Sequence, residues 1–124
     1  MSAFEQLLQS RDVSDMLDEI ASAEPPAYLR RCFAEACSAP ALSAARIPEL
    51  ALCAMVLDAI LDDRDYEVLE PELIADWRMH HAAACRNLRA LAIAALKRAG
   101  GVLETGEPQA AEELAELMRR LAPA

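Results

Sequence analysis

Two side chains near the middle of the longest predicted helix have types and spacing suited to metal chemistry. His81 and Cys85 are four residues apart, so on a helix both project from the same face. Imidazole and thiolate are zinc ligands, and Cys53 or Asp58 from another helix could complete such a site. A packed histidine and a buried free cysteine fit the spacing as well. We favour packing, expect no metal and no cofactor, and keep His81 and Cys85 as the metal candidates.

A cluster of carboxylates follows the most apolar segment of the chain and suits a hard cation. Its members are Asp58, Asp62, Asp63 and Asp65. The calcium-loop pattern and a second acidic motif are both missing, so these side chains are expected to mark the solvated end of a helix. The sequence also lacks the glycine, serine and histidine motifs of common nucleotide-binding and hydrolytic sites. A binding protein is therefore expected rather than an enzyme.

One helix is basic inside an acidic protein. The chain has a net charge of −9, yet residues 77–99 contain five basic side chains and no acidic one. The four that share one side of this helix are called the basic flank: Arg78, Arg86, Arg89 and Lys97. They could contact an acidic partner or a nucleic-acid backbone. The favoured interpretation is pairing with acidic residues of the same chain or of a second copy, and those residues are Asp12, Asp15, Asp18 and Glu19. Nucleic-acid binding is not expected, because its affinity depends on positive charge that neutralises phosphates, and this chain is acidic overall.

The element that would position these residues is one long helix over about 71–99. Pro71 suits its first turn, and Gly100-Gly101 suits its end. Its apolar residues alternate steps of three and four, forming a heptad-like seam: Ile74, Trp77, His81, Ala84, Leu88, Leu91 and Ala95. Such a helix spans about 43 Å, more than the ~35 Å width of a compact chain of this size. We therefore predict a homodimer in which a second copy covers the seam.

The remaining pattern is also helical. The helix that begins near Pro48 is apolar on nearly every side, so it belongs in the centre of a bundle. Other helices are predicted over residues 12–23, from Pro25 to about residue 37, and over 108–121. Residues 1–11 form either a separate short helix or an arm that packs on a second subunit. The prediction is an all-α bundle of four to five helices in a single domain, 1–124.

Composition agrees with a helical protein in a reducing compartment. Aromatic residues make up only 4% of a chain that is 55% hydrophobic, and strand-forming residues are scarce. The most apolar stretch has about twelve residues, whereas a bilayer requires about 20. We expect a cytoplasmic protein without membrane contact, whose four cysteines are free thiols. The excess of alanine and arginine hints at a GC-rich bacterial genome.

These features favour a small acidic protein that acts through protein–protein contacts as an adaptor, a regulator or a chaperone-like protein. Its partners would be a second copy of the chain and a basic protein, because an acidic surface steers basic partners toward it. Two alternatives remain. One is a metal-binding enzyme or sensor that uses His81 and Cys85. The other is a nucleic-acid-binding dimer that uses the basic flank. The sequence does not indicate the partner's identity, a ligand or a pathway.

Overall fold

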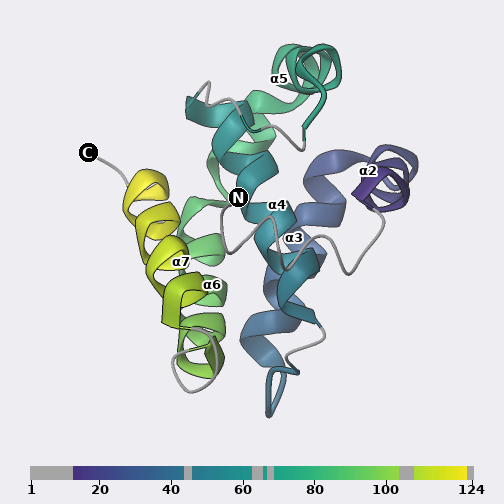
Figure 1. Ribbon diagram of the computed structural model, residues 1–124. Coiled ribbons are helices and arrows are strands. Elements are labelled where there is room, and N and C mark those ends of the chain that lie inside the picture. Colours follow the sequence, from purple (N-terminus) through teal and green to yellow (C-terminus); the bar gives the residue numbers. More distant parts are fainter. Residues whose placement is uncertain (1–12, 44–45, 63–65, 67–68, 104–107, 123–124) are drawn as a thin grey trace.

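The computed structural model describes residues 13–43, 46–62, 66, 69–103 and 108–122. Within these residues every regular element is a helix, so the all-α prediction is confirmed, and the helices form a bundle (Figure 1). Their bounds are α2 Val13–Ser22, α3 Pro25–Ser38, α4 Ile47–Asp62, α5 Pro71–Arg86, α6 Arg89–Leu103 and α7 Pro108–Leu121. The described part of the chain thus has six helices, where the sequence predicted four or five. The predicted N-terminal arm, 1–11, lies outside it.

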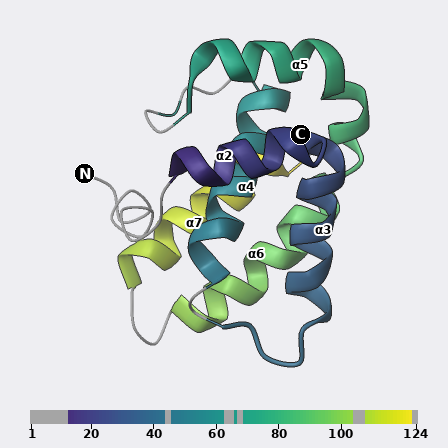
Figure 2. The same cartoon turned by 90° about the vertical axis from the view of Figure 1, so that its right-hand side faces the viewer.

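Helix α4 occupies the centre of the bundle, as its apolar sequence predicts. Every residue from Ile47 to Ile60 except Glu49 is buried. The helix contacts α3, α5, α6 and α7, and Figure 2 shows α5 crossing one end of it while α3 and α6 run along its sides. A helix without a polar face can be stable only when neighbours cover all its sides.

Prolines begin three of the surrounding helices. Pro25, Pro71 and Pro108 are the first residues of α3, α5 and α7. Proline is favoured there because the first N–H groups of a helix have no partner inside it. The connector between α3 and α4 includes a turn in which the Arg46 amide donates to the carbonyl of Ser43, at 3.0 Å. These starting points agree with the sequence prediction.

The single long helix over 71–99 is wrong. The chain turns at Asn87 and Leu88, where the Leu88 amide bonds to the Cys85 carbonyl, and the first bond of α6 runs from the Ala92 amide back to Leu88. Helices α5 and α6 therefore run in different directions (Figure 2). With this turn, Trp77 of α5 and fully buried Leu88 both lie in the core of one chain, and α5 contacts α4. Burying the apolar residues of both α5 and α6 in the core of one chain stabilises the protein more than one continuous helix would.

The predicted stop at Gly100-Gly101 is wrong as well, because α6 continues to Leu103. Neither glycine adopts a positive φ, so neither uses the conformational freedom that favours glycine at helix ends. Gly100 faces Leu114 of α7, and α6 and α7 lie side by side in both views. Helix α6 therefore continues past its glycines along the side of α7.

No described helix has the length and apolar character required to span a bilayer.

Candidate functional site

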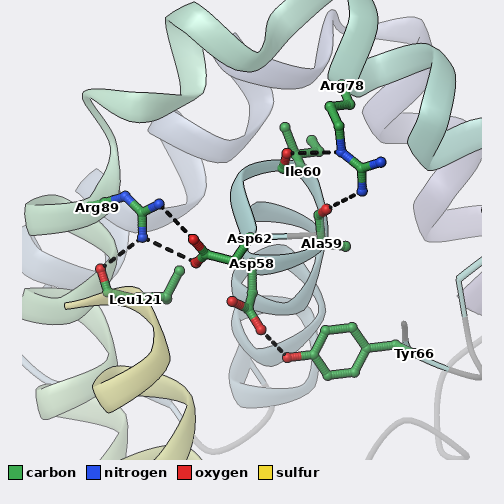
Figure 3. A network of polar contacts seen from close by, with 8 residues as sticks. All are labelled: Asp58, Ala59, Ile60, Asp62, Tyr66, Arg78, Arg89 and Leu121. Carbon is green, nitrogen blue, oxygen red and sulfur yellow. Dashed lines mark hydrogen bonds and ion pairs between the residues drawn. The ribbon is translucent and has the colours of Figure 1, made fainter. Parts of the chain in front are cut away.

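The C-terminal end of α4 is tied to α6 and α7 by one arginine (Figure 3). Arg89 makes a two-pronged ion pair with Asp62, with N–O distances of 2.9 and 3.1 Å. The same guanidinium donates to the carbonyl oxygen of Leu121 at 3.1 Å. The hydrogen bond to Asp62 raises the pKa of Arg89, so this group stays charged. Asp62 is therefore part of a structural contact rather than a solvated helix end.

Asp58 is fully buried inside the apolar helix α4. It accepts a hydrogen bond from the hydroxyl group of Tyr66, and Arg120 approaches that hydroxyl at 3.4 Å. Burial first, and then the bond to Asp58, raises the pKa of Tyr66 to about 12. Asp63 and Asp65 lie outside the described residues. Among the residues that the structure describes, no three His, Cys, Asp or Glu side chains are grouped to hold a metal ion.

The basic flank does not form one continuous surface. Arg78 donates to the carbonyls of Ala59 and Ile60, at 2.6 and 3.2 Å, in the last turn of α4. Arg89 holds Asp62, as described above, while Arg86 and Lys97 are exposed. Two of the four side chains thus bind helix ends of their own chain. Pairing within the chain or between two copies was predicted. Arg89 pairs within the chain, with Asp62 of α4 rather than with the acidic residues of α2.

Arg98 makes a third contact of this type, which the sequence analysis missed. Its guanidinium donates to the carbonyls of Ala36, Cys37 and Ala39 at the end of α3. A positive charge at the C-terminal end of a helix complements the helix dipole. The three arginines therefore act as helix-end clamps, and this accounts for basic side chains in a segment without acids.

The metal candidates differ in exposure. Both residues belong to α5. His81 is half-buried, whereas Cys85 is fully buried in the core. Burial raises the pKa of the Cys85 thiol to about 11, so the thiol stays protonated at neutral pH. A protonated thiol is a poor nucleophile. These positions fit packing better than chemistry.

The predicted seam is divided between two helices. Four of its residues are buried in the chain's own core: Ile74, Trp77, Leu88 and Ala95. His81 and Leu91 are half-buried, and Ala84 is exposed. The length argument for a dimer does not apply to a helix that turns at Leu88. Self-association itself stays a prediction.

A surface hollow lies along α3, between α2 and the first turn of α4. We call it the α3 trough, and it has a volume of about 320 Å³. Its lining consists of Glu19, Tyr28, Arg31, Cys32, Glu35, Arg46 and Glu49. A neighbouring hollow of about 260 Å³ shares Cys32, Glu35, Arg46 and Glu49 with it. The two hollows together bring residues of three helices and one connector to a common surface.

Tyr28 organises the acidic side of the trough. Its hydroxyl donates to Glu49 at 2.9 Å, and the carboxylate of Glu19 lies 3.4 Å away. Burial, followed by the hydrogen bond to Glu49, raises the pKa of Tyr28 well above its ordinary value. Arg31 lies over the Tyr28 ring, with its guanidinium carbon 5.1 Å from the ring centre. The tyrosine thus stays neutral and holds two carboxylates near each other.

The opposite side of the trough is an ion pair in which Arg46 contacts Glu35 at 2.8 Å. With this pair neutralised, the lining that the structure describes leaves Glu19 and Glu49 beside one further cation, Arg31. The trough is therefore negative overall, and its carboxylates can accept hydrogen bonds from a cationic group.

None of these trough contacts was found from the sequence. Tyr28 is 9 residues from Glu19 and 21 from Glu49, so no helical spacing relates the three side chains. The signal that was visible is the excess of acidic residues in the first part of the chain. Comparisons with protein-family models, with curated proteins and with solved structures gave no match.

Proposed function

We propose that this chain acts by non-covalent contact with a basic protein, as an adaptor, a regulator or a chaperone-like protein. The observation that supports this most directly is the α3 trough with its surplus of carboxylates. The net charge of −9 adds a long-range attraction for positively charged partners. The buried thiol of Cys85 and the clamping roles of Arg78 and Arg89 give no comparable support to a metal site or a nucleic-acid surface.

In this proposal, a lysine or arginine side chain of the partner enters the trough beside Glu19 and Glu49, whose carboxylates Tyr28 holds near each other. Tyr28 already positions Glu49, so little side-chain freedom is lost when the cation arrives. Arg31 borders the same space, and its charge would favour a partner in which the basic residue is followed by an acidic or polar one. Binding of this kind weakens as salt screens the charges.

A homodimer belongs to the proposal as a second partner. Because Ile74, Trp77 and Leu88 are packed inside the chain, such a dimer would use accessible side chains instead. Among the described residues, Met79 on α5 is the exposed large hydrophobic side chain, at 80% exposure. The outer face of α5 is therefore the surface that we propose for self-association.

The test of the trough is a titration with an oligolysine peptide at low ionic strength, followed by amide chemical shifts and by calorimetry. The variant Glu19→Gln/Glu49→Gln removes two trough carboxylates, and Glu72→Gln/Glu112→Gln removes two exposed ones elsewhere. Both variants have the same net charge. We expect the first to weaken binding about tenfold, as two charge contacts of roughly 0.7 kcal/mol each predict. Equal weakening in both variants, or shifts away from the trough, would contradict the proposal.

A further inference from the structure

The hollow beside the α3 trough is lined mostly by apolar side chains. Ala36 and Leu50 are buried, Leu42 is half-buried against the core, and Ala39 and Ala41 complete the apolar part of the lining. We call this space the apolar hollow, and its volume is about 260 Å³. An aliphatic side chain that enters it leaves water, which favours binding.

The other end of the same surface is acidic. A third hollow of about 370 Å³ shares Glu19, Tyr28 and Arg31 with the trough and adds Asp18 of α2. Asp18, Glu19 and Glu49 thus border the trough and this third hollow, where Arg31 is the neighbouring cation. This surplus of negative charge complements a basic side chain.

The trough and the apolar hollow meet at an ion pair. Cys32, Glu35, Arg46 and Glu49 line both. The side chains of Arg46 and Glu35 are 52% and 47% exposed and lie 2.8 Å apart, so a peptide that passes over them leaves the pair intact. Because each hollow shares lining residues with the next, the acidic end and the apolar hollow are parts of one surface along α3.

Helix α3 sets the distance between the two ends. Tyr28 and Ala36 both belong to this helix and are eight residues apart, which corresponds to a rise of about 12 Å. In an extended peptide, side chains four positions apart point to the same side and lie about 13 Å apart. Hollows of 260 and 320 Å³ have the size for single side chains rather than for a helix of about 10 Å diameter. An extended peptide therefore delivers one side chain to each.

We propose that the trough and the apolar hollow together bind an extended segment of the partner, in which a lysine or arginine lies four positions from a large aliphatic residue. The basic side chain contacts Glu19 and Glu49, and the aliphatic one fills the apolar hollow beside Leu42. The residue midway between them is small, because it faces the pair of Glu35 and Arg46. This inference rests on the proposed function, since it specifies the partner of the same trough.

The experiment titrates the full-length protein with four capped peptides of glycine and serine and follows amide chemical shifts. The first peptide contains one lysine, and the second adds a leucine four positions from it. The third has the leucine three positions from the lysine, and the fourth has the leucine alone. The second and third are made in both orders, lysine first and leucine first. In one order, the second peptide should bind about tenfold more tightly than the first, because its leucine leaves water.

A pair of protein variants locates the leucine. Ala39→Trp fills the apolar hollow, whereas Ala34→Trp adds the same side chain at an exposed position of α3 that lines neither hollow. Circular dichroism establishes that both variants retain their helices. Ala39→Trp should bind the second peptide only as tightly as the first, with the affinity for the first unchanged. Ala34→Trp should bind both peptides as the unaltered chain does.

The outcomes separate this inference from the proposed function. If the lysine peptide shifts trough amides but the leucine adds no affinity, or adds as much at three positions as at four, this inference is overturned and the proposed function stands. A leucine gain that persists in Ala39→Trp would place the leucine outside the apolar hollow and would overturn it too. If neither these peptides nor oligolysine shift the trough, the proposed function fails, and this inference fails with it.

Discussion

Arg89, in the first turn of α6, and Asp62, the last residue of α4, form a two-pronged ion pair at distances of 2.9 and 3.1 Å (Figure 3). Their side chains are 24% and 28% exposed, so solvent screens the pair only in part. The two residues are 27 positions apart in sequence. Arg89 also donates a hydrogen bond to the Leu121 carbonyl at the end of α7. It fixes the new direction that the chain takes after Asn87.

The first prediction concerns this clamp. Arg89→Ala should lower the free energy of unfolding by about 1–2 kcal/mol, because it removes charge-assisted hydrogen bonds to Asp62 and Leu121. Arg89→Lys should recover only part of the loss, since an ammonium group cannot match the two-pronged geometry. Urea unfolding followed by circular dichroism measures both. Arg86→Ala, at an exposed position on α5, is the matched control and should change stability by less than about 0.5 kcal/mol.

The second prediction concerns stability at high pH. In the folded chain the pKa of Tyr66 is about 12, above its ordinary value of 10. A raised pKa means that the folded state favours the protonated hydroxyl, so this stabilisation is complete below pH 10 and is lost as the pH rises through 12. Tyr66→Phe lacks the hydroxyl and should be less stable at neutral pH by about 1–3 kcal/mol, because Asp58 loses a donor in the core.

The measurement is the difference in urea midpoint between the unaltered chain and Tyr66→Phe from pH 7 upward. This difference isolates Tyr66 from Tyr28, whose pKa is also raised. It should be constant up to about pH 10 and then shrink. A difference that stays constant to pH 12 would show that folding does not raise the pKa of Tyr66.

The third prediction concerns the glycines inside α6. Gly101→Ala should stabilise the protein by up to about 1 kcal/mol, because alanine restricts the unfolded chain and favours helix. A methyl group at this position meets nothing within 4 Å. At Gly100 the methyl group would lie 3.5 Å from Leu114, which is ordinary contact, so Gly100→Ala is the companion variant. Thermal unfolding of both compares them. A lower midpoint for Gly101→Ala would mean that α6 ends before this residue.

The fourth prediction separates core packing from self-association. Leu88→Asp should reduce stability by about 3 kcal/mol or more, because it removes a fully buried side chain and places a charge in the core. Met79→Asp should leave stability nearly unchanged, since Met79 is 80% exposed. Light scattering after size-exclusion chromatography reports the oligomeric state. We expect a dimer of the unaltered chain and a monomer of folded Met79→Asp. A dimer that persists in Met79→Asp excludes the outer face of α5.

The local signals in the sequence were enough to predict much of the fold. Alanine- and leucine-rich segments with few strand formers predicted the all-α class, since helix propensity is a property of short segments. The prolines at 25, 71 and 108 marked helix starts for a similarly local reason. The central place of α4 followed from its lack of a polar face. Each of these inferences depends on residues within a few turns of one another.

Contacts between residues distant in sequence decided the turn at Leu88, the arginine contacts and the α3 trough. The heptad-like spacing around Leu88 is compatible with a straight helix or with a turn. Burial of both Trp77 and Leu88 in the core of one chain favours the turn. The basic flank was visible as charge, but whether Arg78 and Arg89 face solvent or the end of α4 depends on where α4 ends in space. The α3 trough likewise exists because three helices meet. Residue types and spacing therefore determined the helices of this protein, and burial and electrostatics between helices determined its turns, clamps and candidate site.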